Sequence, residues 1–234
     1  MIKIFIVYLK NVENTNTRLS GGVTTNYYIN LIINNISKKL TYCGINHSFD
    51  EFIPSKNPRE SIILSFKTNN SIDCIPCKKS GVSIYFNSGN PESKMISEII
   101  YKHFKSIYYN PSNVNLVSNK SPKSRFYPEC TISLGFNNNK KDLEWIRGNI
   151  DNISGIITIS ICEFFGLPFV HHKMNEFRIL NTNTNTYLRP SKNSKIAFSC
   201  KQNQKIHICG QWENWYIVEE NNIFGYIPTN YLCT

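Results

Sequence analysis

The first 170 residues alternate between short apolar runs and longer segments with helical periodicity. Runs rich in Ile, Val, Phe, Tyr and Leu predict buried strands at residues 2–9, 61–66, 81–86 and 130–134. Apolar residues that recur every three or four positions predict helices at residues 26–40, 90–107, 143–146 and 150–165. Strands that alternate with helices indicate an α/β fold with a mostly parallel sheet and helices on both faces.

Local signals mark the ends of two predicted helices. Asn90 can cap a helix that begins at Pro91, because proline suits the first helical position. Gly166, followed by Pro168, is a typical C-terminal stop for the helix before it.

After residue 170 the pattern changes to short β-rich runs separated by polar turns. These runs lie at residues 187–190, 195–200, 205–209, 215–218 and 224–227. Such close spacing is typical of a small all-β barrel. We therefore predict a domain over residues 1–170, a linker over 171–176 that contains the His171-His172 pair, and an all-β domain over 177–234.

Composition and charge exclude some classes of function. The formal net charge is +10, but the basic residues are spread over both parts of the chain. A nucleic-acid-binding protein usually concentrates them in one stripe, so this class is not favoured. Diffuse positive charge suits a polyanionic surface such as a cell wall, and equally suits solubility alone. No apolar run approaches the roughly 20 residues of a membrane span, and Lys3 interrupts an N-terminal run that lacks a signal-peptide cleavage site.

The eight cysteines are interpreted mainly as free, buried thiols. Cys74 and Cys77 form a lone C-x-x-C pair, which is a weak metal signal without a second pair. Cys200 and Cys209 could face each other across neighbouring strands. Whether either pair is linked stays open.

The all-β region resembles the bacterial SH3 domain. The resemblance is carried by Tyr187-Leu-Arg-Pro190, by the tryptophan-rich stretch 210–218 and by the Gly-Tyr-Ile hairpin with its closing Tyr-Leu at 225–232. It implies a module that binds peptidoglycan or its peptide cross-bridges through an aromatic groove. The candidate ligand-binding residues are Tyr187, Trp212, Trp215, Tyr216 and Tyr226, with a role in the core as the alternative for each.

Residues 1–170 resemble the zinc-dependent N-acetylmuramoyl-L-alanine amidases of clostridial and phage-endolysin type. Residues 61–69 resemble the family strand that ends in S-x-H-x-N, and residues 133–139 resemble its E-x-G-F-x-x-N motif. The following Asp142-Leu-Glu-Trp-Ile146 and the helix that closes at Phe165-Gly-Leu-Pro168 also match the family pattern. The resemblance implies the amidase fold over this whole region.

The residues that would hold and use the zinc are all replaced in this chain. The degenerate positions are Lys10 and Lys67 for the two histidines, Asn26 for the glutamate ligand and Ser133 for the catalytic glutamate. A lysine ammonium has no lone pair to offer a metal, and two of them repel Zn²⁺. We therefore expect no catalytic residue, no zinc and no other cofactor at this site.

These features lead to the hypothesis of a catalytically inactive amidase-like protein, a pseudoenzyme that binds peptidoglycan as an accessory or complex subunit. Its expected partners are peptidoglycan or its peptide cross-bridges and a protein such as an active lysin or an assembly subunit, with neither nucleic acid nor a membrane span. Two alternatives stay open: an active amidase with an altered site, and a protein-interaction scaffold that does not bind the wall. We expect synthesis in the cytoplasm without a signal peptide and action at the cell wall or after release.

Overall fold

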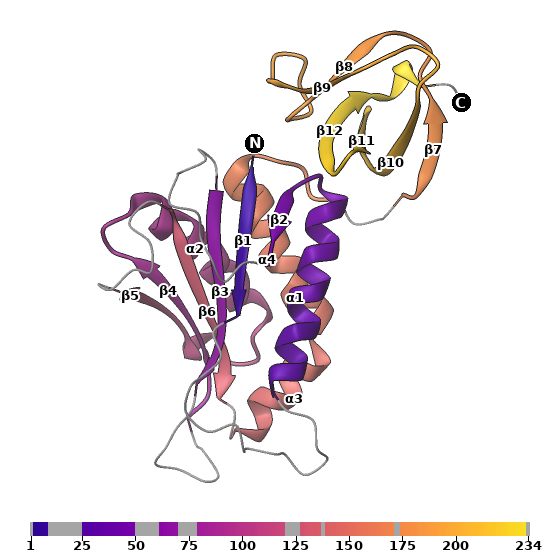
Figure 1. Cartoon of the computed structure of the whole chain (residues 1–234). Coiled ribbons are helices and arrows are strands. Elements are labelled where there is room, and N and C mark those ends of the chain that lie inside the picture. The colour runs from indigo at the N-terminus through magenta and orange to yellow at the C-terminus, as the bar shows by residue number, and fades with distance from the viewer. Residues whose placement is uncertain are drawn as a thin grey trace.

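The computed structural model describes residues 2–8, 25–49, 61–69, 79–119, 127–136, 139–170 and 174–232. These residues form an α/β part up to residue 170 and an all-β part from residue 174, each built on one six-stranded sheet (Figure 1). The strands of the first sheet are β1 (Lys3–Tyr8), β2 (Asn46–Ser48), β3 (Ser61–Asn69), β4 (Val82–Asn87), β5 (Val114–Asn119) and β6 (Glu129–Phe136). Its helices are α1 (Thr25–Tyr42), α2 (Pro91–Ile107), α3 (Lys140–Gly148) and α4 (Ile150–Phe165), with a 3-10 turn η1 (Pro111–Asn113) before β5.

The first sheet has the strand order β2-β1-β3-β6-β4-β5. Within it, β6 and β4 pair antiparallel, and the other neighbours pair in parallel. The predicted mostly parallel α/β sheet is therefore confirmed. The short strands β2 and β5 were not predicted, because β2 holds no apolar residue and β5 holds only three.

The helices α1, α2 and α4 pack against one face of this sheet. Their apolar sides join Ile4, Leu64, Ile132 and Ile84 in one buried cluster. The opposite face carries a separate small cluster of Phe5, Ile63 and Tyr127. Within the described part of the chain, the helices cover one face of the sheet only. This corrects the prediction of helices on both faces. Helical periodicity identifies an amphipathic helix but not the side of the sheet that it covers.

The predicted helix ends are confirmed. The Asn90 side chain accepts a hydrogen bond from the Ser93 N–H at 2.9 Å. Gly166 ends α4 in the left-handed conformation, with φ 63°. Asn139 caps α3 in the same way as Asn90 caps α2, by accepting a bond from the Asp142 N–H at 3.1 Å.

The second sheet has the strand order β7-β10-β11-β12-β8-β9, and its described strand pairs are all antiparallel. Its strands are β7 (Glu176–Ile179), β8 (Thr184–Tyr187), β9 (Ile196–Cys200), β10 (Lys205–Trp212), β11 (Trp215–Glu220) and β12 (Ile223–Pro228), followed by a 3-10 turn η2 (Thr229–Tyr231). Its own buried cluster includes Leu180, Ile208, Val218 and Ile227. The predicted all-β character is confirmed, and membership of the bacterial SH3 family stays a prediction.

The all-β part packs on the end of the α/β part at which α1 finishes (Figure 1). The Tyr226 hydroxyl donates a buried hydrogen bond of 2.7 Å to the Cys43 carbonyl. Ile217 and Tyr226 belong to the same buried cluster as the α/β core. The two sheets therefore share apolar packing, while the division into two domains at residues 171–176 stays a prediction.

Two further expectations concern cysteines and membranes. Cys200 and Cys209 are buried thiols and form no disulfide with each other. Cys43, Cys130 and Cys162 are also buried thiols outside any disulfide. Cys74 and Cys77 lie outside the described residues. Among the helices that the structure describes, none combines the length and apolarity needed to cross a membrane.

Candidate functional site

The candidate site lies at the edge of the first sheet where β3 and β6 end. Lys67 on β3 and Ser133 on β6 are direct partners across the two parallel strands. Neighbouring strands in a sheet lie about 4.7–4.9 Å apart, so these two partnered residues lie side by side. In α/β proteins, ligands bind outside the carboxyl ends of the parallel strands, and this is such an edge.

A third degenerate position, Asn26, lies at the same end of the first sheet. Asn26 lies in the first turn of α1, which begins where β1, β3 and β6 finish (Figure 1). The side chain of Asn26 and the whole of Lys10 lie outside the described residues. The structure therefore brings Lys67 and Ser133 together and places Asn26 on their end of the sheet.

The two described side chains at this edge, Lys67 and Ser133, do not fit a catalytic zinc. The half-buried Lys67 ammonium lies 4.1 Å from the centroid of the Tyr85 ring, in a cation–π contact. The Ser133 side chain is fully buried, and its hydroxyl has no hydrogen-bond partner among the described residues. Zinc sites are built from His, Cys and carboxylate ligands. An ammonium beside a serine hydroxyl offers neither a zinc ligand nor a general base at neutral pH.

Asp142 is a fully buried carboxylate near this edge. It accepts hydrogen bonds from the backbone N–H groups of Phe136 at 2.9 Å and Gly81 at 3.2 Å. It also accepts bonds from the hydroxyls of Tyr108 and Tyr109. Burial and the bond to Asp142 raise the pKa of the Tyr108 hydroxyl well above its usual range. With donors on both oxygens, Asp142 links α3 to β6, to the residue before β4 and to the segment after α2, and is a structural anchor.

A glycine makes room for this anchor. Gly135 has φ +69°, and a Cβ added there would lie 2.9 Å from the Cβ of Asp142. Both the conformation and the close approach require glycine. The motif Leu134-Gly-Phe136 therefore positions Asp142, which the sequence marked only as an acidic residue of the family pattern.

The aromatic candidates in the second sheet divide into surface and core residues. Trp212 is 38% exposed, and Trp215 is its partner across the β10–β11 hairpin. The rings of Tyr187 and Trp215 meet edge to face, with centroids 6.0 Å apart. These three half-buried or exposed rings form an aromatic group, defined here as Tyr187, Trp212 and Trp215.

Tyr216 and Tyr226 do not belong to the aromatic group, which corrects the interpretation of these two residues. Tyr216 is buried, and its hydroxyl accepts a hydrogen bond from the Arg178 guanidinium at 3.0 Å. Tyr226 is only 2% exposed, and its hydroxyl is bonded to the Cys43 carbonyl. The two side chains point to opposite faces of the sheet: Tyr216 joins the buried cluster of the all-β part, and Tyr226 joins the buried cluster of the α/β part.

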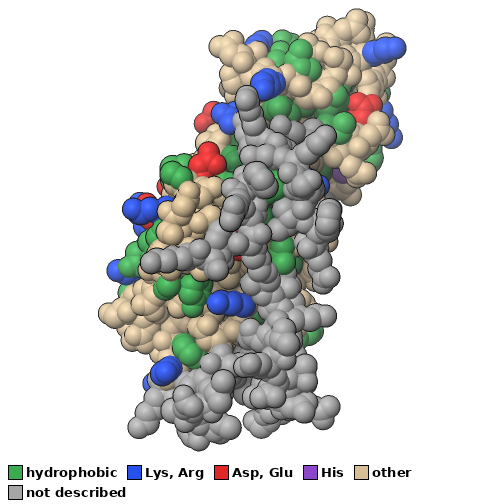
Figure 2. Space-filling view, turned by 60° about the vertical axis from the view of Figure 1, so that its left-hand side comes forward, with side chains coloured by type: hydrophobic (Ala, Val, Ile, Leu, Met, Phe, Trp, Pro, Cys, Tyr) green, Lys and Arg blue, Asp and Glu red, His purple; other side chains and the backbone are tan. Residues whose placement is uncertain are grey.

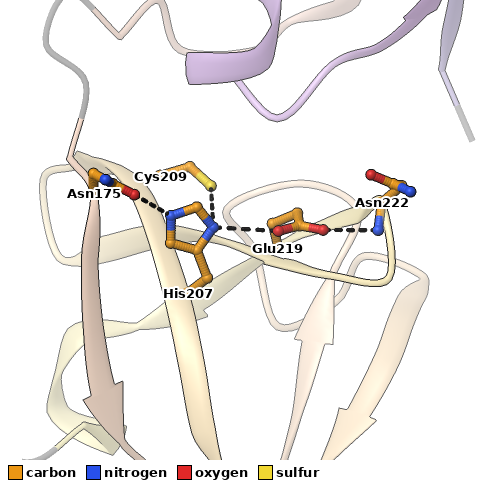
Figure 3. A network of polar contacts seen from close by, with 5 residues as sticks. All are labelled: Asn175, His207, Cys209, Glu219 and Asn222. Atoms are coloured by element: carbon orange, nitrogen blue, oxygen red, sulfur yellow. Dashed lines mark hydrogen bonds and ion pairs between the residues drawn. The ribbon is translucent and has the colours of Figure 1, made fainter.

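A polar network that was not predicted surrounds His207 on β10 (Figure 3). The Nε2 atom of His207 lies 2.8 Å from the Asn175 side-chain oxygen, and its Nδ1 atom lies 3.2 Å from Glu219. The Cys209 sulfur is 3.6 Å from the same Nδ1 atom, and the Phe177 ring stacks on the imidazole with centroids 5.0 Å apart. Cys209 is 4% exposed, so this group stabilises the junction and offers no accessible nucleophile.

Comparisons with known proteins support the fold of the α/β part. No protein-family model matches the chain, and no curated protein matches it in sequence. Among solved structures, it is similar to the N-acetylmuramoyl-L-alanine amidase AmiC2 of Nostoc punctiforme, with a TM-score of 0.55 and 13% identity over 70% of this chain and 97% of that chain.

Two further solved structures give the same result. The CwlD amidase from Clostridioides difficile, solved in complex with the GerS lipoprotein, has a TM-score of 0.56 and 14% identity over 71% of this chain and 99% of that one. The catalytic domain of the CD27L endolysin targeting Clostridia difficile has a TM-score of 0.52 and 13% identity over 70% of this chain and 98% of that one. At such low identity the likeness shows the fold alone: this chain has an amidase-like fold.

Proposed function

We propose that this chain is a non-hydrolytic, amidase-like protein that binds peptidoglycan. The observation that carries the proposal is the pairing of Lys67 with Ser133 at the strand ends of an amidase-like fold. Metal-assisted amide hydrolysis requires a Lewis acid to polarise the carbonyl and a base to handle the proton of the attacking water. An ammonium and a hydroxyl at these positions supply neither.

The nearby carboxylate does not replace the missing base. Asp142 is fully buried, and donors that the structure describes occupy both of its oxygens. A general base must reach the proton that it removes, directly or through one water. Asp142 therefore supports the fold of the site and takes no part in chemistry there.

Two features support binding to the wall. The aromatic group of Tyr187, Trp212 and Trp215 exposes part of its ring surface on the all-β part. The net charge of +10 attracts polyanions, and on the face shown in Figure 2 the Lys and Arg side chains are dispersed. We place the protein at the cell wall or in the medium after release.

A protein partner is the second part of the proposal. One protein of similar fold, the CwlD amidase, has been solved in complex with a lipoprotein. An amidase-like subunit without its own chemistry would serve as an accessory to an active lysin or an assembly. Its partner would be recovered by crosslinking the wall-bound protein in extracts of the native host.

Sedimentation with purified sacculi tests wall binding. We expect the intact protein to pellet with sacculi, and Trp212→Ala to weaken binding by about tenfold, because exposed tryptophans are typical binding hot spots. Met95→Ala is the matched control, since Met95 is 48% exposed on α2, away from the aromatic group. Failure of the intact protein to pellet would favour a scaffold that does not bind the wall.

A further inference from the structure

The loop between β8 and β9 forms a surface pocket that the candidate site and the aromatic group do not use. It connects two strands at the edge of the all-β part (Figure 1). The pocket has a volume of about 400 Å³, and it is lined by six residues of this one loop: Leu188, Arg189, Ser191, Asn193, Ser194 and Lys195. We call it the loop pocket. Arg189, Asn193 and Lys195 are exposed, so a ligand in solution can reach them.

Backbone hydrogen bonds hold the loop pocket in one shape. The Leu188 N–H donates to the Lys195 carbonyl at 2.8 Å and closes the loop. Within it, the Ser191 N–H donates to the Arg189 carbonyl at 2.7 Å, and the Ser194 N–H donates to the Ser191 carbonyl at 3.0 Å. A loop that its own bonds already order loses little further conformational freedom when a ligand binds, so more of the contact energy appears as affinity.

The charge of the loop pocket favours an anion. Its two charged lining residues, Arg189 and Lys195, are both cations. Arg189 also interacts with another group of the chain, but its positive charge attracts an anion whether or not all of its N–H bonds are free. Residues 177–212, which include the loop, hold six Lys or Arg residues and no Asp or Glu. The lining therefore offers no carboxylate that would repel an anionic ligand.

The remaining lining residues determine the kind of anion. Ser191, Asn193 and Ser194 carry hydroxyl and amide groups that both donate and accept hydrogen bonds. The volume falls in the range of small-molecule sites, about 300–1,000 Å³, so the pocket has room for the groups beside the anion. A phosphodiester flanked by hydroxyl groups fits these features. Single-stranded nucleic acid also carries phosphodiesters, but it binds on aromatic side chains that stack its bases, and none of the six lining residues is aromatic.

We propose that the loop pocket binds a phosphodiester of a polyol phosphate polymer. The Lys195 ammonium donates to the phosphate oxygens and Arg189 adds positive charge, while the serine and asparagine side chains bond to the neighbouring hydroxyls of the polyol. This inference goes beyond the proposed function, because the ligand is a polymer other than peptidoglycan. The lining also shares no residue with the aromatic group, so the two sites can be tested separately.

Three soluble polymers with the same number of negative charges test the ligand class. They are poly(glycerol phosphate), poly-L-glutamate and a single-stranded oligonucleotide. Binding of each polymer to the intact protein is measured by isothermal titration calorimetry at one low ionic strength. We expect poly(glycerol phosphate) to bind at least about threefold more tightly than either of the others, because it alone presents a phosphodiester together with small polyol hydroxyls, and one hydrogen bond is worth roughly that factor.

Substitutions then locate the site. Lys195→Met removes the charge and leaves the backbone bond to Leu188 in place, so binding of poly(glycerol phosphate) should weaken by about tenfold, whereas Lys195→Arg should retain most of it. Lys201→Met is the matched control, because Lys201 is also an exposed lysine of the all-β part but lies beyond the opposite end of β9. It removes the same charge and should weaken binding by less than about twofold. Urea midpoints confirm that each variant is folded.

Equal losses in Lys195→Met and Lys201→Met would show diffuse attraction and overturn the loop pocket as a site. Equal or tighter binding of poly-L-glutamate or of the oligonucleotide would overturn the assignment to a polyol phosphate. Sacculi stripped of phosphodiester polymers by hydrofluoric acid separate this failure from that of the proposed function. A protein that pellets with stripped sacculi but does not bind poly(glycerol phosphate) would overturn the loop pocket alone, whereas the reverse result would support the pocket and contradict binding to peptidoglycan.

Discussion

Replacing Asp142 should destabilise the protein more than replacing any exposed carboxylate. The side chain is fully buried and accepts bonds from the N–H groups of Gly81 and Phe136 and from the hydroxyls of Tyr108 and Tyr109. Each buried donor left without an acceptor costs about 1–3 kcal/mol, although the hydroxyls can rotate toward other acceptors. We therefore expect Asp142→Ala to lower the free energy of unfolding by about 3–5 kcal/mol, out of a total of roughly 5–15 kcal/mol.

The substitution Asp142→Asn should lower the free energy of unfolding by less than Asp142→Ala, because the two side-chain oxygens of Asp142 accept from different kinds of donor. Both backbone N–H groups bond to Oδ2, whereas both tyrosine hydroxyls bond to Oδ1. In Asp142→Asn the amide oxygen can stay with the fixed N–H groups, and the tyrosine hydroxyls can turn to accept from the NH₂ group. The remaining loss is that of the charge-assisted bonds, about 1–2 kcal/mol.

Urea unfolding followed by tryptophan fluorescence measures these differences. The fluorescence of Trp145 reports on the surroundings of Asp142, since its ring centroid lies 4.7 Å from that of Tyr108, which donates to Asp142. Asp151→Asn is the control, because the Asp151 side chain is 79% exposed in its ion pair with Lys39, and such pairs are worth less than about 1 kcal/mol. If Asp142→Ala cost no more than Asp151→Asn, Asp142 would not be an anchor of this site.

Two other substitutions test the junction and the pH response. Tyr226→Phe removes the hydroxyl that bonds to the Cys43 carbonyl, so the free energy of unfolding should fall by about 1–3 kcal/mol in urea titrations, whereas Tyr187→Phe should change it little. His47 contacts the Ser37 hydroxyl at 2.6 Å and the Ile45 carbonyl, and its burial lowers its pKa. The folded state therefore resists protonation, and stability should fall as the pH drops below about 6.5, where unfolded histidine gains its proton. His47→Gln should flatten that loss in urea midpoints at pH 7.5 and 5.5, and an unchanged slope would contradict the assignment to His47.

Much of the fold followed from periodicity and local signals. The alternation in Cys130-Thr-Ile-Ser-Leu134 marked β6, and Asn90, Pro91 and Gly166 marked helix ends. The same alternation also separates the polar side chains Thr131 and Ser133 from the apolar ones. Helices on both faces were nevertheless expected, because periodicity says nothing about which face of the sheet a helix covers.

The candidate site was predicted only in part. The resemblance to the amidases identified Lys67 and Ser133 as candidate site positions, and the strand register shows that they are neighbours. The burial of Tyr216 and Tyr226 on opposite faces of the sheet could not be predicted, because the strands of this small sheet carry apolar residues on both sides. The anchor role of Asp142 depends on donors far away in the chain, such as Gly81, and no local pattern reports such a contact.

The most direct test asks whether sacculi that bind the protein are cleaved. Cleavage of the bond between muramic acid and L-alanine would create new L-alanine amino termini, which amino-group labelling and mass spectrometry quantify. Metal content is measured on the same preparation, with an active amidase as positive control. The account predicts protein that pellets with sacculi, holds no stoichiometric zinc and releases no new L-alanine amino termini, whereas bound zinc together with new termini would contradict it.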